Sequence, residues 1–195
     1  MDSGVAGLLG ALIGGIISWF ATWSIEVRRD RRQARNLALA AASEIDAALE
    51  MVSARNWRQE FVTALALAEK GIVDLGTIHV RDDYLPMCRA AMAHAGVISR
   101  ELSVDLARFI TLADALTSDL KRMAEHSPGT YGALFAEDDA EGAARVYESL
   151  IKIIDSAFVV GTRMVTLVDK MYPKEISGYV ARFKGAWNII AAGSL

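Results

Sequence analysis

The sequence predicts an all-α protein in which one N-terminal transmembrane helix continues into a cytoplasmic bundle of about four to five helices. Three observations predict this class: an uncharged N-terminal run, apolar residues at helical spacing in most later segments, and a composition rich in alanine with only 3 prolines. The 195 residues amount to about one domain. We expect residues 1–25 to form the anchor, residues 26–36 a basic juxtamembrane segment, and residues 37–195 the helical domain.

The anchor is predicted from the 23 residues between Ser3 and Ile25, none of which is charged. A helix of that length spans about 34 Å, enough for a hydrocarbon layer of about 30 Å. A secretory signal peptide would carry positive charge before its apolar run, and only Met1, Asp2 and Ser3 precede this one. We therefore expect an uncleaved span. The alternative is a buried helix of a soluble protein.

The orientation of the span is predicted from the charges that follow it. Glu26 and Asp30 are outnumbered by five arginines, namely Arg28, Arg29, Arg31, Arg32 and Arg35. The positive-inside rule places this flank in the cytoplasm of a bacterial cell and the N-terminus outside the inner membrane. The same arginines are expected to contact anionic lipid headgroups. Trp19 and Trp23, beside Phe20, are expected to lie at the inner interface, because aromatic rings prefer that layer.

Small residues form two rows along the predicted span. The first row repeats every four residues and the second lies beside it: Ala6, Gly10, Gly14, Ser18 and Thr22, then Gly7, Ala11 and Gly15. Helix backbones approach closely across such a face, and in lipid this packing drives association. We predict self-association through this face. The alternative is a monomer in which the glycines have no such role.

Helical spacing continues after the basic segment. Apolar residues from Leu37 to Val52 share one side, and the same phase runs on to about Lys70, where Gly71 provides a stop. A break near residues 53–56 is left open. Residues 71–83 form an irregular connection, with Asp82 or Asp83 as the cap of the next helix.

Four further helices are expected. A short one covers about residues 84–97 with Pro86 in its first turn, and a longer one begins near residues 99–101 and ends at about His126. The acids of residues 137–141 favour a third N-terminus, and that helix runs to about Met171, before Pro173. Its inward face is expected to hold Tyr147, Leu150, Ile151, Ile154, Phe158, Val165 and Val168. Residues 174–192 are amphipathic and are expected to close the bundle.

Charges interrupt the apolar stretch 150–168 and exclude it as a second span. Lys152, Asp155 and Arg163 would each cost about 2.5–3.5 kcal/mol near the centre of a bilayer. Asp155 and Arg163 stand eight residues apart, about two helical turns, and so on roughly one face. They either bind a partner's charges or pair with other helices of the bundle.

Recognisable chemistry is absent from the sequence. It contains no GxxxxGK, HExxH, CxxC pair or GxSxG motif. Cys88 and His94 fall on different faces of one short helix, so we expect Cys88 to pack as a small hydrophobe, and Glu44, Glu101 and Glu148 to lie on solvated faces. We predict no enzyme, cofactor, metal or small-molecule substrate, and the net charge of −3 argues against nucleic-acid binding.

The order of segments resembles a loose group of uncharacterised bacterial single-pass inner-membrane proteins. The resemblance covers about residues 4–120: a glycine-rich span, the flank RRDRR, an alanine-rich helix and the passage YLPMCRAAMAHAGVISRELSVDLARFITLADAL. It implies a helical inner-membrane protein, and it carries over no catalytic residue.

The functional hypothesis follows from an anchor joined to a helical body without chemistry. We expect a non-catalytic interaction, scaffold or regulatory subunit of a bacterial inner-membrane complex, with membrane lipid and either further copies of the chain or a membrane protein as partners. The alternative is a membrane-perturbing effector, such as a phage lysis or abortive-defence component. Toxicity on expression distinguishes the two.

Overall fold

In the computed structural model, the described residues are 3–73, 84–124 and 139–173, with side chains described from Gly14 on except that of Ala124. Within these ranges the chain forms five helices and no strand. The helices are α1 (Ser3–Ala54), α2 (Trp57–Ala68), α3 (Pro86–Ala93), α4 (Arg100–Ala124) and α5 (Ala140–Met171). The predicted all-α class is confirmed.

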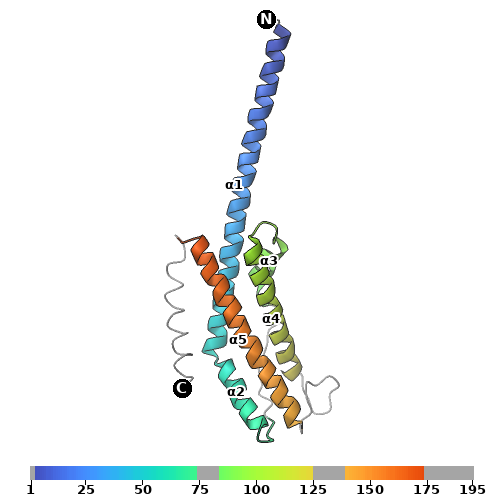
Figure 1. The fold of residues 1–195 in the computed structure, drawn as a ribbon, viewed down its shortest axis with the longest axis vertical. Helices are drawn as coiled ribbons and strands as arrows, with labels where there is room; N and C mark the ends of the chain where they lie inside the picture. Colours follow the sequence, from blue (N-terminus) through green and yellow to red (C-terminus); the bar gives the residue numbers. More distant parts are fainter. Residues whose placement is uncertain (1–2, 74–83, 125–138, 174–195) are drawn as a thin grey trace.

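The longest element, α1, is an unbroken helix of 52 residues. Figure 1 shows its N-terminal part standing alone beyond the other helices, while its C-terminal part packs between α3 and α5. The predicted helical continuity through the basic segment is therefore confirmed. Among the described residues, no helix combines the length and the apolar character required to cross a membrane.

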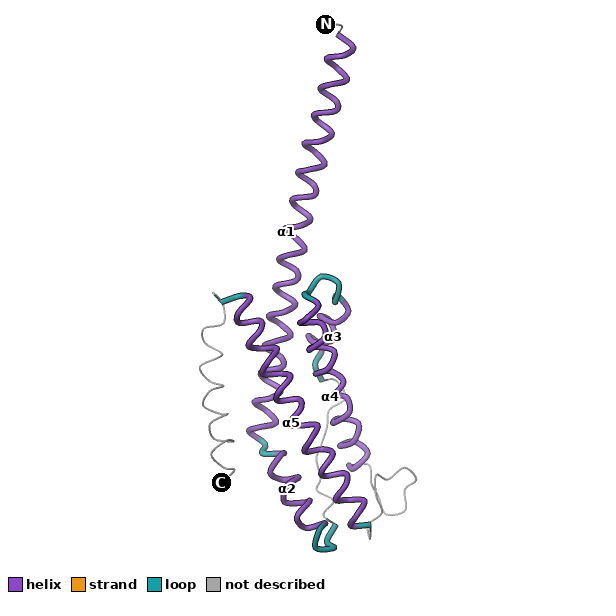
Figure 2. The backbone as a smooth tube through the Cα atoms, in the orientation of Figure 1, coloured by secondary structure: helices purple, strands orange, loops and turns teal. Residues whose placement is uncertain are grey.

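The bundle is organised around α5. This helix runs in the direction opposite to α1, α2 and α4, and it packs against all three (Figures 1 and 2). α3 covers the end of the bundle from which α1 emerges.

α1 and α2 are separated by a break at Asn56. Its φ of 54° lies in the left-handed region, which asparagine tolerates better than most residues. The guanidinium carbon of Arg55 lies 5.8 Å from the centroid of the Trp57 ring, on the far side of the break. Of the two alternatives that the sequence leaves open near residues 53–56, the break is therefore correct.

Two clusters of buried side chains form the core. The upper cluster joins α1 and α3 to the first half of α4 and the last half of α5, with Ile45, Cys88, Leu106 and Met164 among its members. The lower cluster joins α2 to the other halves of α4 and α5, with Trp57, Phe61, Leu120, Tyr147 and Ile154 among its members. Half-buried Phe158 packs against both clusters.

Gly161 permits the close crossing of α5 with its neighbours in the upper cluster. A Cβ atom at this position would lie 2.9 Å from Leu49 Cδ1 and 3.0 Å from both Ile45 Cγ2 and Phe109 Cε2. The buried stripe of α5 therefore passes through Ala157, Gly161 and Met164. Ile151 and Val165, which are predicted to face inward, are only half-buried at its edge.

The start of α3 differs from the prediction. The position before its first residue is held by Leu85, at a φ of 63°, rather than by Asp82 or Asp83, which lie outside the described residues. The side chain that caps the first turn of α3 comes from α1 instead: Glu44 Oε2 accepts a hydrogen bond of 2.7 Å from the backbone N–H of Cys88. The prediction that Glu44 lies on a solvated face is therefore wrong, because a helix distant in sequence uses it as a cap.

The other helix ends agree with the sequence. α4 and α5 span close to their predicted ranges, and Pro173 follows the end of α5. Asp139 is the N-cap of α5, because its Oδ1 accepts a hydrogen bond of 2.7 Å from the N–H of Gly142. The predicted end of α4 at His126 and the predicted helix over residues 174–192 lie outside the described residues.

Candidate functional site

The most exposed apolar surface lies on the part of α1 that precedes the bundle. We call residues 3–33 the α1 arm, because no described side chain before Ala34 belongs to or packs against either core cluster. Its large apolar side chains are more than half or about half exposed: Ile16 58%, Ile17 64%, Trp19 68%, Phe20 58%, Trp23 50% and Ile25 65%. A contiguous apolar patch of this kind marks an interaction surface.

The aromatic side chains of the α1 arm form one group. The rings of Trp19 and Trp23 stack with centroids 6.4 Å apart, and Phe20 lies 5.7 Å from Trp23. The nearby hydroxyls bond to the backbone of their own helix, Thr22 Oγ1 to the carbonyl of Ser18 and Ser24 Oγ to that of Ala21, each at 2.9 Å. The arm thus presents apolar surface without unpaired hydroxyls at these two positions.

The described part of the small-residue face is open. Nothing lies within 4 Å of a Cβ atom added at Gly14 or Gly15, and Ser18 and Thr22 are exposed. The side chains of the other four residues of this face, Ala6, Gly7, Gly10 and Ala11, lie outside the described residues.

The predicted basic cluster surrounds the base of the α1 arm. Arg28, Arg29, Arg31 and Arg32 are exposed, whereas Arg35 is half-buried where α1 joins the bundle. The exposed guanidinium groups follow directly after the aromatic group, so the arm carries an apolar section and then a positively charged one.

Asp155 and Arg163 each pair with a different helix. Asp155 accepts two hydrogen bonds from Arg58 of α2, at 2.7 Å from Nε and 3.1 Å from Nη2. Arg163 lies 3.0 Å from Asp105 and 3.5 Å from Glu101, both of α4. Of the two alternatives raised by the sequence, the structure places both residues in ion pairs within the bundle, with side chains still about half exposed.

Asp105 is a charged residue that the sequence analysis missed. It is 1% exposed, and its Oδ2 forms the ion pair with Arg163 without accepting a hydrogen bond. The signal was present, because Asp105 stands between Leu102 and Phe109 in the apolar stripe of α4. A buried acid in such a stripe requires a partner on the neighbouring helix.

A second pair of acids has no such partner among the residues that the structure describes. Asp46 of α1 and Asp169 of α5 repel one another, and the buried oxygens Asp46 Oδ1 and Asp169 Oδ1 and Oδ2 accept no hydrogen bond. Burial raises the pKa of both carboxyls, and the charges of Glu50 and Asp169 raise that of Asp46 further. The ionised pair therefore destabilises the contact between α1 and α5.

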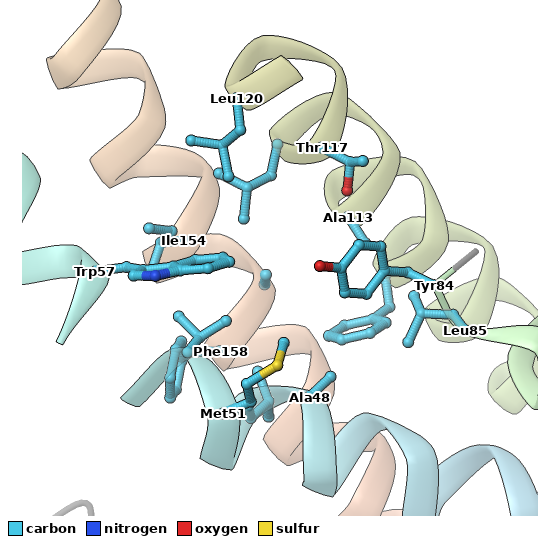
Figure 3. Close-up of a pocket in the computed structure, with 15 residues that line it drawn as sticks. Ala48, Met51, Trp57, Tyr84, Leu85, Ala113, Thr117, Leu120, Ile154 and Phe158 are labelled. Atoms are coloured by element: carbon cyan, nitrogen blue, oxygen red, sulfur yellow. The ribbon is translucent and has the colours of Figure 1, made fainter. Parts of the chain in front are cut away.

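A cavity of about 70 Å³ lies where the two core clusters meet (Figure 3). Four helices contribute to its walls: Leu49 comes from α1, Trp57 from α2, Phe109 from α4 and Ile154 from α5. Tyr84 and Leu85, which precede α3, also line it. Its surface is almost entirely hydrocarbon.

The described residues contain no group of three histidine, cysteine, aspartate or glutamate side chains that could hold a metal ion. Cys88 is buried against the carbonyl of Ala41, and burial, with Glu44 beside it, raises the pKa of its thiol. A thiol held in its neutral form is a poor nucleophile.

Comparison with known protein families, with curated proteins and with solved structures finds no match. The resemblance to bacterial single-pass proteins stays a prediction. The case for a function therefore rests on the α1 arm, its basic base and the helical bundle.

Proposed function

We propose that this chain is a non-catalytic subunit of a bacterial inner-membrane complex. In this proposal the apolar part of the α1 arm crosses the membrane once with the N-terminus outside, and the bundle in the cytoplasm serves as an interaction, scaffold or regulatory module. Copies of the chain associate through the small-residue face of the span. Membrane lipid and further copies or another membrane protein are the partners.

The exposed apolar side chains of the α1 arm carry the proposal. Fully burying one large apolar side chain stabilises by about 1.5–3 kcal/mol. Covering the six on the arm would therefore contribute on the order of 10 kcal/mol, which is comparable to the whole stability of a domain. A bilayer supplies such cover along a single isolated helix.

The neighbouring features are consistent with this cover. The hydroxyls of Thr22 and Ser24 are satisfied inside the helix, as residues in hydrocarbon require. The proposed span begins at Ser3, and its first eleven residues lie before the first described side chain, Gly14. The sequence there, SGVAGLLGALI, contains no charge.

Charge supports the proposed orientation. Residues 1–36 contain five arginines and three acids, and residues 37–195 contain 16 basic and 21 acidic side chains. Anionic headgroups attract the base of the arm, each arginine contributing about 1 kcal/mol, and they repel the acidic remainder. The bundle is then held below the bilayer rather than flat against it.

Alkaline carbonate extraction of cell membranes tests the anchor. The full chain should stay in the membrane pellet, whereas a matched chain lacking residues 1–25 should be released. A reporter fused after Leu195 should be active only in the cytoplasm. Release of the full chain, or a reporter active outside the cytoplasm, would contradict the proposal.

Self-association is tested separately in detergent. Gly10→Ile combined with Gly14→Ile should reduce the oligomer to a monomer by size measurement, because the added side chains separate the backbones. Leu9→Ile combined with Leu12→Ile, at positions outside both small-residue rows, should leave the size unchanged. An unchanged size in the glycine variant removes self-association from the proposal and leaves the anchor intact.

A further inference from the structure

We propose that the cavity between the two core clusters binds a small aromatic molecule that carries one hydrogen-bonding group, such as an indole or a phenol. The inference does not depend on the proposed membrane anchor, because the cavity lies inside the bundle. It also departs from the expectation that the chain takes no small molecule.

The position of the cavity argues against an incidental packing defect. It lies at the level of the α1–α2 break, where the upper and lower clusters meet, and both clusters contribute walls. α1 and α4 each pack on both α3 and α5, and α2 packs on α5 and α1. The cavity lies in the space between these helices, at the level where α1 gives way to α2.

The walls of the cavity are rich in aromatic rings. Trp57 comes from α2, Phe109 from α4, Phe158 from α5, and Tyr84 from the residues that precede α3. In Figure 3, Trp57 and Tyr84 face one another from opposite sides of the space. Aromatic rings pack favourably at centroid separations of about 4.5–7 Å, edge to face or offset, so a planar ring is the shape best matched to these walls.

The polarity of the cavity lining further restricts the class of ligand that can bind. Almost all of the lining is apolar, and two hydroxyls, those of Tyr84 and Thr117, point towards the space in Figure 3. The Thr117 hydroxyl can donate to or accept from a single polar group on the ligand. An apolar body with one N–H or O–H group meets these requirements, and a charged ligand does not.

The cavity has about half the volume of a closed one that holds a single ring, so a ring enters it only as the lining side chains move. A closed apolar cavity of about 150 Å³ lined by leucine, isoleucine and phenylalanine stays dry and binds benzene. The cavity described here is about 70 Å³ and open along one side, so a ring can enter with one edge towards solvent. Met51 and Phe158 line it and are only half-buried, which allows them to adjust.

Methyl NMR of the full chain in detergent tests the proposal with indole as the probe. Methionine methyl groups are labelled with ¹³C, and the Met51 signal is assigned by its loss in Met51→Leu. Indole should shift the Met51 signal through ring currents along a saturable curve. Met123 and Met164, which do not line the cavity, serve as internal controls for indole dissolved in the micelle.

A variant that fills the cavity separates binding from non-specific contact. Ala113→Leu places a larger side chain in the space from α4, so it should weaken the Met51 response at least about tenfold. Ala107→Leu, two turns away on the same helix and outside the lining, should keep the response. If Ala113→Leu does not fold, Thr117→Leu is used in its place, because position 117 lines the same cavity one turn further along α4.

Three outcomes decide the proposal. A saturable shift of Met51 that Ala113→Leu or Thr117→Leu removes supports it. A Met51 signal that stays in place at saturating indole, or that moves equally in the filled variants, overturns it. Cyclohexanol has the size of phenol without an aromatic ring, and binding as tight as that of phenol overturns the aromatic assignment.

Discussion

At the scale of single residues, Gly161 determines how closely α5 approaches its neighbours. The side chains of Leu49, Ile45 and Phe109 occupy the space that a Cβ atom would need. We expect Gly161→Ala to lower the free energy of unfolding by about 1 kcal/mol. Overpacking costs about 1–3 kcal/mol, and the better helix propensity of alanine compensates for about 1 kcal/mol of that cost. Thermal unfolding followed by circular dichroism measures this. Gly96→Ala, where the added atom meets nothing, should be close to neutral, and equal effects would contradict the packing argument.

The acids Asp46 and Asp169 predict a pH dependence with a definite sign. Their pKa values are raised in the folded state, so the folded chain binds protons more readily than the unfolded chain. This favours the fold fully below the ordinary aspartate pKa of about 3.9, and the benefit is lost as the pH rises through the raised values. Asp169→Asn should therefore raise the melting temperature at pH 7.5, and the gain should shrink towards pH 4.

The control for that prediction is Glu148→Gln, which removes an exposed acid from the same helix. It should lack the gain seen with Asp169→Asn at pH 7.5. A gain for Asp169→Asn that is the same at both pH values would exclude the repulsion as its cause.

Residue-scale outcomes show what the sequence can and cannot reveal. The pattern identified Asp155 and Arg163 as charges that need partners, yet only the fold shows that Arg58 and Asp105 provide them. The two partners lie 97 and 58 positions away in the chain, and local spacing carries no information about such distant contacts. The cavity is hidden for the same reason, since its walls come from four helices.

At the scale of elements, α3 depends on α1 for its start. Leu85 holds a left-handed conformation ahead of the helix, and Glu44 supplies the acceptor for the N–H of Cys88. We expect Glu44→Ala to cost about 1–2 kcal/mol, as the loss of a helix cap does, and Glu44→Gln to cost less because its amide oxygen can still accept. Hydrogen exchange at the Cys88 amide should accelerate in Glu44→Ala. Ser43→Ala, at the exposed neighbouring position, should leave that exchange rate unchanged.

The sequence predicted the elements better than their faces. Helical spacing located α4 and α5, because leucine and isoleucine recur on their buried sides. On α5 the predicted face correctly held the buried Tyr147, Leu150, Ile154 and Val168, but it missed Ala157 and Gly161, since large apolar residues dominate a hydropathy pattern. Small residues bury little area themselves, and they mark where two helices come closest.

At the scale of the whole molecule, apolar and charged surfaces are arranged in order along one axis. The exposed apolar section of the α1 arm comes first, the arginines follow, and the bundle lies beyond them (Figure 1). Residues 37–195 carry an excess of acids, 21 against 16 basic side chains, so the positive charge is concentrated at the junction. In the proposed function this order fixes which end of the span stays in the cytoplasm.

The junction can be tested by removing its charge. Replacing Arg28, Arg29, Arg31 and Arg32 with serine leaves Glu26 and Asp30 as the majority charges beside the span. Because orientation follows the imbalance of lysine and arginine across a span, part of the chain should insert with the C-terminus outside, and a phosphatase fused after Leu195 should gain activity there. A matched variant with Arg89, Arg108, Arg122 and Arg145 replaced by serine loses the same number of charges from the bundle and should keep a single orientation. If only the first variant changes orientation, the position of the four arginines beside the span matters rather than the number of charges lost. An unchanged reporter in both variants would show that the flank does not orient the chain.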